Sequence, residues 1–95
     1  SLSAQDAEDA ASTLAQTVRG HIKTLGAKNY WEKMESPDFT VLFLPSEYLF
    51  SQALRADPLL ADVAAQNNII ICSPTLLMSL LRVVSVGWRQ ADLAK

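Results

Sequence analysis

The sequence contains few of the residues that build disulfides and metal sites. It has one cysteine, Cys72, and one histidine, His21, in 95 residues. A disulfide framework within one chain is therefore excluded, and no transition-metal site is expected, because no second histidine or cysteine stands at ligand spacing. Cys72 ends an apolar run that begins at Ile69. We therefore expect a buried, unreactive thiol.

Basic charge and long apolar runs are also scarce. Ten acidic residues outnumber eight Lys and Arg residues, which gives a formal net charge of −2. A broad nucleic-acid-binding surface normally shows a basic excess, so any DNA contact must be local. No apolar run approaches the roughly 18 residues that span a bilayer, and the start lacks the order of a signal peptide. We expect a cytoplasmic protein whose segment makes no membrane contact.

Catalytic signatures are missing as well. The three glycines, Gly20, Gly26 and Gly87, are isolated, so no glycine-rich phosphate-binding loop is present. No nucleophile-elbow pattern supports a serine nucleophile. We therefore do not expect these residues to catalyse a reaction by themselves.

The residues that are present suffice for one small core. Hydrophobic residues make up 49% of the chain, and a second domain does not fit in this length. A helical pattern begins almost at Ser1, as expected where a longer protein is cut. We interpret residues 1–95 as a single partial domain.

A long helix opens the chain. Apolar residues separated by threes and fours predict a helix from Ala4 to about Leu25, with Ser3 as N-cap and Gly26 closing it. The first half of the apolar stripe carries only small side chains, such as Ala7 and Ala11, which bury little area. This alanine-rich half is expected to need a partner.

Five further elements follow. They are a strand from Phe39 to Leu44, a helix from Ser46 to roughly Arg55, a short helix from Pro58 to Ala65 capped by Asp57, a strand from Ile69 to Cys72, and a long helix from Ser73 to about Ala94. Both strands are apolar on both faces, as parallel strands covered by helices are. The order helix–strand–helix–helix–strand–helix predicts an α/β fold with a partial parallel sheet. Two strands make a poor sheet, so its neighbours must come from upstream chain or another subunit.

A polar and aromatic patch marks the end of the first helix. His21, Lys23 and Lys28 are followed closely by Tyr30 and Trp31. The lysines could hold DNA phosphates while an aromatic ring stacks on a base. Alternatively, the lysines complement the helix dipole and the rings pack under a loop.

Two features of the last helix are also ambiguous. Ser73, Pro74 and Thr75 stand where a parallel strand ends and a helix begins, which suits an anion-binding site or plain helix capping. Arg82 and Arg89 are seven residues apart and should share one helix face. They could follow a phosphate backbone or simply solvate that face.

A longer succession of residues carries a family resemblance. It comprises His21, Ile22, Lys23 and Leu25; Lys28 to Trp31; Pro37, Asp38 and Phe39; Leu42 to Glu47; Ala56, Asp57 and Pro58; Ser73 to Leu77; and Trp88 with Arg89. From about His21 to Gln90, this series resembles the RmuC family of bacterial DNA recombination proteins. The spacing of the whole series is more specific than any single motif.

The resemblance implies a fragment of a restriction-endonuclease-like fold of the PD-(D/E)XK kind, in a protein that limits DNA rearrangement at inverted repeats. In such folds the acidic residues and lysine that position a metal lie on earlier elements. Mg²⁺ or Mn²⁺ would then be held elsewhere in the parent protein, which would be the endonuclease, and this chain would lack the catalytic motif.

The resemblance also places His21, Lys28 and Tyr30 near the substrate side of that fold, and Ser73 and Thr75 match family positions as well. The alternative function is a non-catalytic protein-interaction module. In that case the alanine-rich helix or an open sheet edge would form a homo-oligomer.

Overall fold

The computed structural model describes residues 3–27 and 39–93. Its elements, in chain order, are α1 (Ala4–Ala27), β1 (Thr40–Phe43), α2 (Glu47–Ala56), α3 (Leu60–Gln66), β2 (Ile69–Cys72) and α4 (Pro74–Leu93). The predicted α/β class and order of elements are confirmed. No helix within the described ranges is long and apolar enough to cross a membrane.

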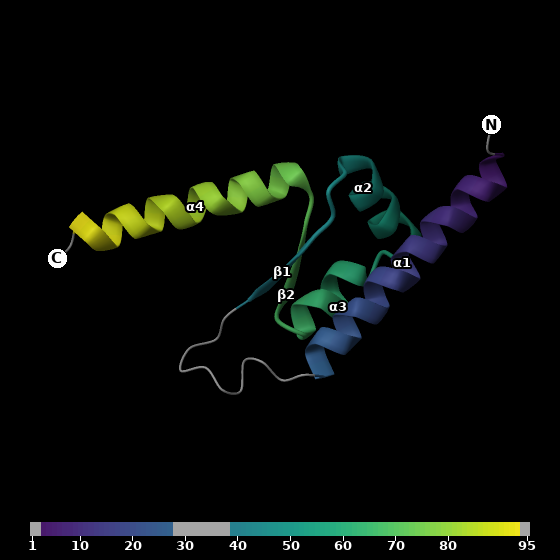
Figure 1. Cartoon of the computed structure of the whole chain (residues 1–95), viewed down its shortest axis with the longest axis horizontal. Coiled ribbons are helices and arrows are strands. Elements are labelled where there is room, and N and C mark those ends of the chain that lie inside the picture. The colour runs from purple at the N-terminus through teal and green to yellow at the C-terminus, as the bar shows by residue number, and fades with distance from the viewer. Residues whose placement is uncertain (1–2, 28–38, 94–95) are drawn as a thin grey trace.

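The two strands pair in parallel, and helices cover one face of the sheet. In the register, Thr40 lies beside Ile69 and Phe43 beside Cys72. Ile69 and Ile71 point into a core that α1, α2 and α3 complete on that face. Figure 1 shows these three helices grouped on one side of the strands. The core therefore lies between one sheet face and three helices.

The outer face of β1 is uncovered in the described part of this chain. Side chains alternate along a strand, so Val41, Phe43 and Ile70 point away from the core. Val41 is 39% exposed and Phe43 is 45% exposed. The prediction that β1 is covered on both faces is wrong for these residues, because no described element packs over its outer face.

The last helix projects away from the body. No residue of α4 is buried, and its apolar side chains include Trp88, which is 76% exposed. Figure 1 shows α4 running from the end of β2 in the direction opposite to the start of α1. The molecule is consequently elongated, with extents of 58 × 28 × 17 Å.

Three predicted helix caps are confirmed. The Ser3 hydroxyl accepts from the amide of Asp6 at 3.1 Å, and the Ser46 hydroxyl accepts from the amide of Leu49 at 3.2 Å. The Ser73 hydroxyl accepts from an amide in the first turn of α4 at 3.2 Å. Each cap satisfies a helix amide that has no partner within the helix, which is why these helices begin where the sequence predicts.

The predicted start of α3 is wrong by two residues. The helix begins at Leu60, and Pro58 lies outside it. Asp57 was expected to cap this helix. Instead it is the C-cap residue of α2, and its carboxylate accepts from Arg19 at 2.8 and 3.0 Å. A weaker bond of 3.3 Å from the Leu59 amide stabilises the turn. The carboxylate joins α1 to the α2–α3 turn.

The predicted end of α1 is also wrong, because the helix continues through Gly26 to Ala27. Gly26 has a packing role there. A Cβ atom at this position would lie 2.0 Å from Oδ1 of Asn67, at the end of α3. The absence of a side chain lets the two elements approach closely.

Candidate functional site

The start of α4 combines a buried helix cap with a hydrogen bond to a carboxylate of α2. Ser73 is 1% exposed and caps the helix, while the Thr75 amide donates to Oε1 of Glu47 at 2.6 Å. Glu47 is the first residue of α2. Its carboxylate therefore already occupies an amide that a bound anion would use.

The electrostatics of this site follow from those bonds. The Thr75 hydroxyl and amide, with a smaller contribution from Ser73, lower the pKa of Glu47 below its ordinary value by stabilising the charged form. An external anion at this helix end would have to displace a carboxylate of the same sign. The anion site at Ser73 and Thr75 stays a prediction, and the geometry seen is that of helix capping.

The patch at the end of α1 lies only partly in the described chain. His21 and Lys23 are exposed on either side of Ile22, which is fully buried. Residues two apart on an α-helix point about 200° apart, so these two side chains face different directions. Lys28 and Tyr30, like Asn29 and Trp31, lie outside the described residues. The patch as a nucleic-acid-binding surface stays a prediction.

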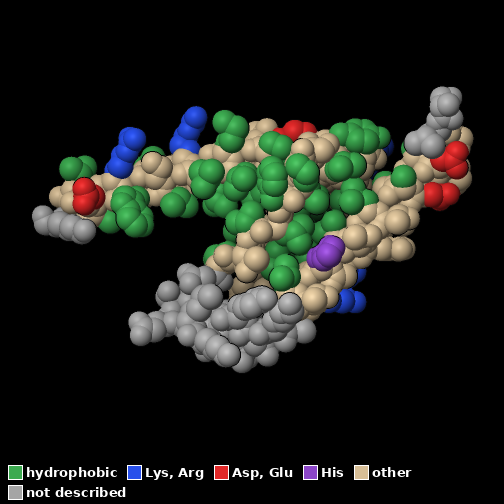
Figure 2. Space-filling model, viewed as in Figure 1, with side chains coloured by type: hydrophobic (Ala, Val, Ile, Leu, Met, Phe, Trp, Pro, Cys, Tyr) green, Lys and Arg blue, Asp and Glu red, His purple; other side chains and the backbone are tan. Residues whose placement is uncertain are grey.

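The two arginines of α4 share one side of that helix. Arg82 and Arg89 border the same surface as Met78, Leu81 and Val86. Both arginines are exposed. Figure 2 shows the two basic side chains of α4 along one edge of the helix. The expected common face is thus present, and its surroundings are partly apolar.

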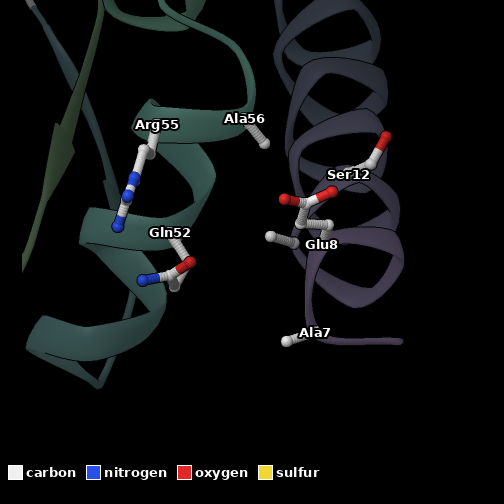
Figure 3. Close-up of a pocket in the computed structure, with 7 residues that line it drawn as sticks. Ala7, Glu8, Ser12, Gln52, Arg55 and Ala56 are labelled. Carbon is white, nitrogen blue, oxygen red and sulfur yellow. The ribbon is translucent and has the colours of Figure 1, made fainter. Parts of the chain in front are cut away.

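A shallow groove separates the first half of α1 from α2. Its volume is about 410 Å³, and it is lined by Ala7, Glu8, Ala11, Ser12, Gln52, Arg55 and Ala56. Figure 3 shows Glu8 directed into the space between the helices, with Gln52 and Arg55 projecting from α2. Ala11 is 9% exposed, because α2 already covers part of the stripe. The remainder of the alanine-rich face is open.

Several carboxylates of the described chain make structural contacts. Asp6 accepts from the Ser3 amide, Asp9 accepts from Gln5, and Asp57 pairs with an arginine. Within residues 3–27 and 39–93, no three metal-ligating side chains come together.

The single cysteine is buried as expected. Cys72 is 2% exposed, and its burial raises the pKa of the thiol by disfavouring the thiolate. A thiol in this state is a poor nucleophile. Cys72 therefore contributes packing at the end of β2.

Sequence reasoning missed two interactions at the ends of α2. The bonds from Arg19 to Asp57 and from Thr75 to Glu47 join residues 38 and 28 positions apart. From the sequence alone, each of these side chains has a sufficient local role: a helix cap, a charge in the first turn of a helix, or a solvated surface residue. No local signal distinguishes these pairs, because only the packing of α1, α2 and α4 brings them together.

Comparison with known proteins gives a consistent family match. The family model described as the RmuC family matches residues 1–95. The chain is 49% identical over 81 residues to the "DNA recombination protein RmuC homolog" of Chlamydia trachomatis, covering 84% of this chain and 19% of that relative. It is 46% identical over 76 residues to the homolog of Pseudomonas aeruginosa, covering 78% of this chain and 17% of that protein.

A protein named "DNA recombination protein RmuC" in Salmonella typhimurium is 40% identical over 75 residues, covering 77% of this chain and 16% of that protein. The chain thus spans less than a fifth of the length of these relatives. No solved structure shows a significant match.

Proposed function

The chain belongs to the RmuC family, and on this premise we propose that it forms the C-terminal part of a nuclease-like domain in a DNA recombination protein. Its role is to complete the fold of that domain and to add local contacts to the DNA backbone. The metal-binding residues lie in other parts of the parent protein. The names of the relatives support the link to DNA recombination.

The incomplete sheet is the observation that carries this proposal. Parallel sheets are stable when both faces are covered, yet Val41 and Phe43 on the outer face of β1 are 39% and 45% exposed. A helix that is apolar over most of its surface is usually buried in a larger domain, yet no residue of α4 is buried. Both features suit a segment that packs against further chain in a parent domain.

DNA contacts in this proposal are few and local. His21 and Lys23 lie on α1, and Arg82 and Arg89 lie on α4, all exposed. With a net charge of −2, these side chains can position a phosphate backbone but cannot supply strong non-specific affinity by themselves. The proposed contribution is positioning of DNA that the parent protein binds mainly elsewhere.

A nuclease assay tests whether the metal-binding residues lie outside this chain. The chain and a version extended upstream by about 100 residues, enough to complete a typical domain, are incubated with DNA and Mg²⁺ or Mn²⁺. We expect cleavage by the extended form alone. Cleavage by the short chain would contradict the proposal that the metal site lies elsewhere in the parent protein. Absence of cleavage by both forms would contradict the proposal that the domain is nuclease-like.

A salt-dependent DNA-binding titration of the extended form tests the contacts. Replacing Lys23 and Lys28 by alanine should weaken binding about tenfold or more and reduce the slope of log K against log salt by about 2. Arg55→Ala is the matched control, because Arg55 borders the α1–α2 groove on another surface. The double variant removes two basic charges and the control removes one, so an equal loss of affinity per charge removed would mean that only net charge matters.

The alternative function is a protein-interaction module, and the exposure of α4 favours it. In that case Ala7→Glu with Ala11→Glu, or charges placed on α4, should abolish association with a partner. Loss of the lysines should then leave association unchanged. Binding to DNA that survives these changes would favour the nuclease-like proposal.

A further inference from the structure

Helices α2 and α4 begin side by side. Because β1 and β2 are parallel, their carboxyl ends lie at the same edge of the sheet, and a helix follows each strand from that edge. Figure 1 shows the first turns of α2 and α4 next to each other there. The Thr75 amide of α4 donates to Oε1 of Glu47, the first residue of α2, at 2.6 Å. One carboxylate therefore bridges the starts of two helices.

The amide that Glu47 binds has no acceptor within its own helix. The first amides of an α-helix lack intrahelical partners. In α4, Pro74 has no amide hydrogen, and the Leu76 amide donates to the Ser73 hydroxyl. The Thr75 amide is left, and it meets a charged acceptor at the positive end of both helix dipoles. Glu47 thus completes the cap of α4 from a different helix.

The contacts between α4 and the body lie at the base of the helix. No residue of α4 is buried, and its half-buried residues, Pro74, Leu77 and Leu80, lie in the first two turns. Beyond them the helix projects from the body (Figure 1). Apolar contact is non-directional, whereas a hydrogen bond prefers one distance and one angle. The bond from Thr75 to Glu47 is therefore a directional restraint at the base of α4.

We propose that Glu47 is a positioning residue whose carboxylate fixes the direction in which α4 leaves the sheet. Thr75 lies about 3 Å along the helix axis from Ser73, so a movement of about 1 Å at Thr75 turns the helix by about 20°. Ser85 lies about 18 Å from Ser73, and the same turn moves it by about 6 Å. A small change at the base thus becomes a large displacement along α4.

The direction of α4 decides where Arg82 and Arg89 lie. In the proposed function these two side chains contact a DNA backbone, and phosphate contacts depend on the register of the protein on the duplex. Glu47, although acidic, would then support DNA binding by placing two basic residues. This consequence rests on the proposed function, whereas the role of Glu47 in directing α4 does not.

The distance between two spin labels measures the direction of α4. Gln16→Cys on α1 and Ser85→Cys on α4 are both exposed, and they are labelled in the upstream-extended protein after its other reactive cysteines are replaced by serine. Glu47→Ala should shift the distance or broaden its distribution by about 6 Å. Glu47→Gln should keep the wild-type distribution, because its amide oxygen can still accept the hydrogen bond.

Two controls separate positioning from general stability. Asp62→Ala removes an acidic residue from the first turn of α3 and should leave the α1–α4 distance unchanged. Labels at Gln16→Cys and Gln66→Cys both lie in the body, and their distance should be the same with and without Glu47→Ala. The positioning role would be overturned by an unchanged α1–α4 distance in Glu47→Ala, by an equal change in Asp62→Ala, or by an equal change between the two labels in the body.

A DNA-binding titration of the extended protein measures the consequence for Arg82 and Arg89. Removing an acidic residue raises the net charge by one, so net charge alone predicts that Glu47→Ala binds DNA more tightly. Positioning predicts the opposite sign: Glu47→Ala should bind about threefold more weakly or worse, and Glu47→Gln should bind at least as tightly as the wild type.

The double variant Arg82→Ala with Arg89→Ala separates the two proposals. If it binds DNA as tightly as the wild type, the proposed DNA contacts of α4 are wrong, and the spin-label distances still decide whether Glu47 directs the helix. If it binds weakly while Glu47→Ala binds more tightly than the wild type, Glu47 does not position the arginines.

Discussion

Replacing Gly26 by alanine should destabilise the protein, although the same change elsewhere in α1 should stabilise it. The added Cβ atom would lie 2.0 Å from Oδ1 of Asn67 and 2.8 Å from its Cγ. Asn67 cannot yield freely, because its side-chain amide donates to the Val63 carbonyl at 2.8 Å. At Gly20 of the same helix, an added Cβ would meet nothing within 4 Å.

The magnitude follows from three contributions. Alanine in place of glycine inside an exposed helix gains about 1 kcal/mol. At Gly26 this gain is opposed by overpacking, at about 1–3 kcal/mol, and by loss of the Asn67 hydrogen bond, at about 1 kcal/mol. Gly26→Ala should therefore cost about 1–3 kcal/mol net, whereas Gly20→Ala should gain about 1 kcal/mol.

Urea denaturation followed by far-ultraviolet circular dichroism measures both changes, and a double-mutant cycle identifies their cause. Asn67→Ala removes the obstructing atoms, so adding Gly26→Ala to that variant should cost nothing or stabilise it. If Gly26→Ala were as stabilising as Gly20→Ala in the wild-type background, the close approach of α1 to Asn67 would be refuted.

Three further predictions concern the remaining contacts. Hydrogen bonds from Thr75 lower the pKa of Glu47 in the fold, so their contribution is complete above its ordinary value of 4.5 and is lost as pH falls through the lowered folded value. In urea titrations below pH 4.5, the wild type should therefore lose stability faster than Glu47→Gln as the pH falls. Arg19 and Asp57 form a bidentate ion pair whose side chains are 32% and 21% exposed. A double-mutant cycle with Arg19→Ala and Asp57→Ala should therefore give a coupling free energy of about 0.5–1 kcal/mol, which should become smaller in high salt. A coupling of zero would refute a structural role for the pair. Leu60→Ala should lower the free energy of unfolding by about 2–5 kcal/mol, because Leu60 is fully buried. Leu59→Ala should lower it by less than about 0.5 kcal/mol, because Leu59 is 61% exposed. Similar melting temperatures of the two variants would contradict the described core.

Much of the fold could be predicted from local chemistry. Ser3, Ser46 and Ser73 each provide a hydroxyl where a helix begins, and short apolar runs end at proline or at a cap. Such signals act within a few residues, so the sequence contains all of their physical cause. The errors at Asp57 and Gly26 arose because tertiary partners, not local capping, determine what those residues do.

The candidate site was less predictable. The sequence suggests Thr75 as an anion contact, whereas in the structure its amide donates to the carboxylate of Glu47, 28 residues earlier. His21 and Lys23 were grouped by their proximity in sequence, yet helical geometry directs them apart. Proximity in sequence therefore shows which residues are near one another in the chain, but it does not show whether their side chains face the same direction.

The sequence by itself determined the α/β class, the element order, the buried thiol and the family, because each depends on periodicity, capping residues or a distinctive succession of motifs. Only the tertiary structure decided that the outer face of β1 is uncovered, that Glu47 occupies the start of α4, and that no residue of α4 is buried. The physical reason is that an apolar pattern specifies which side chains need to be buried, whereas their burial depends on which elements of the chain can reach them in space.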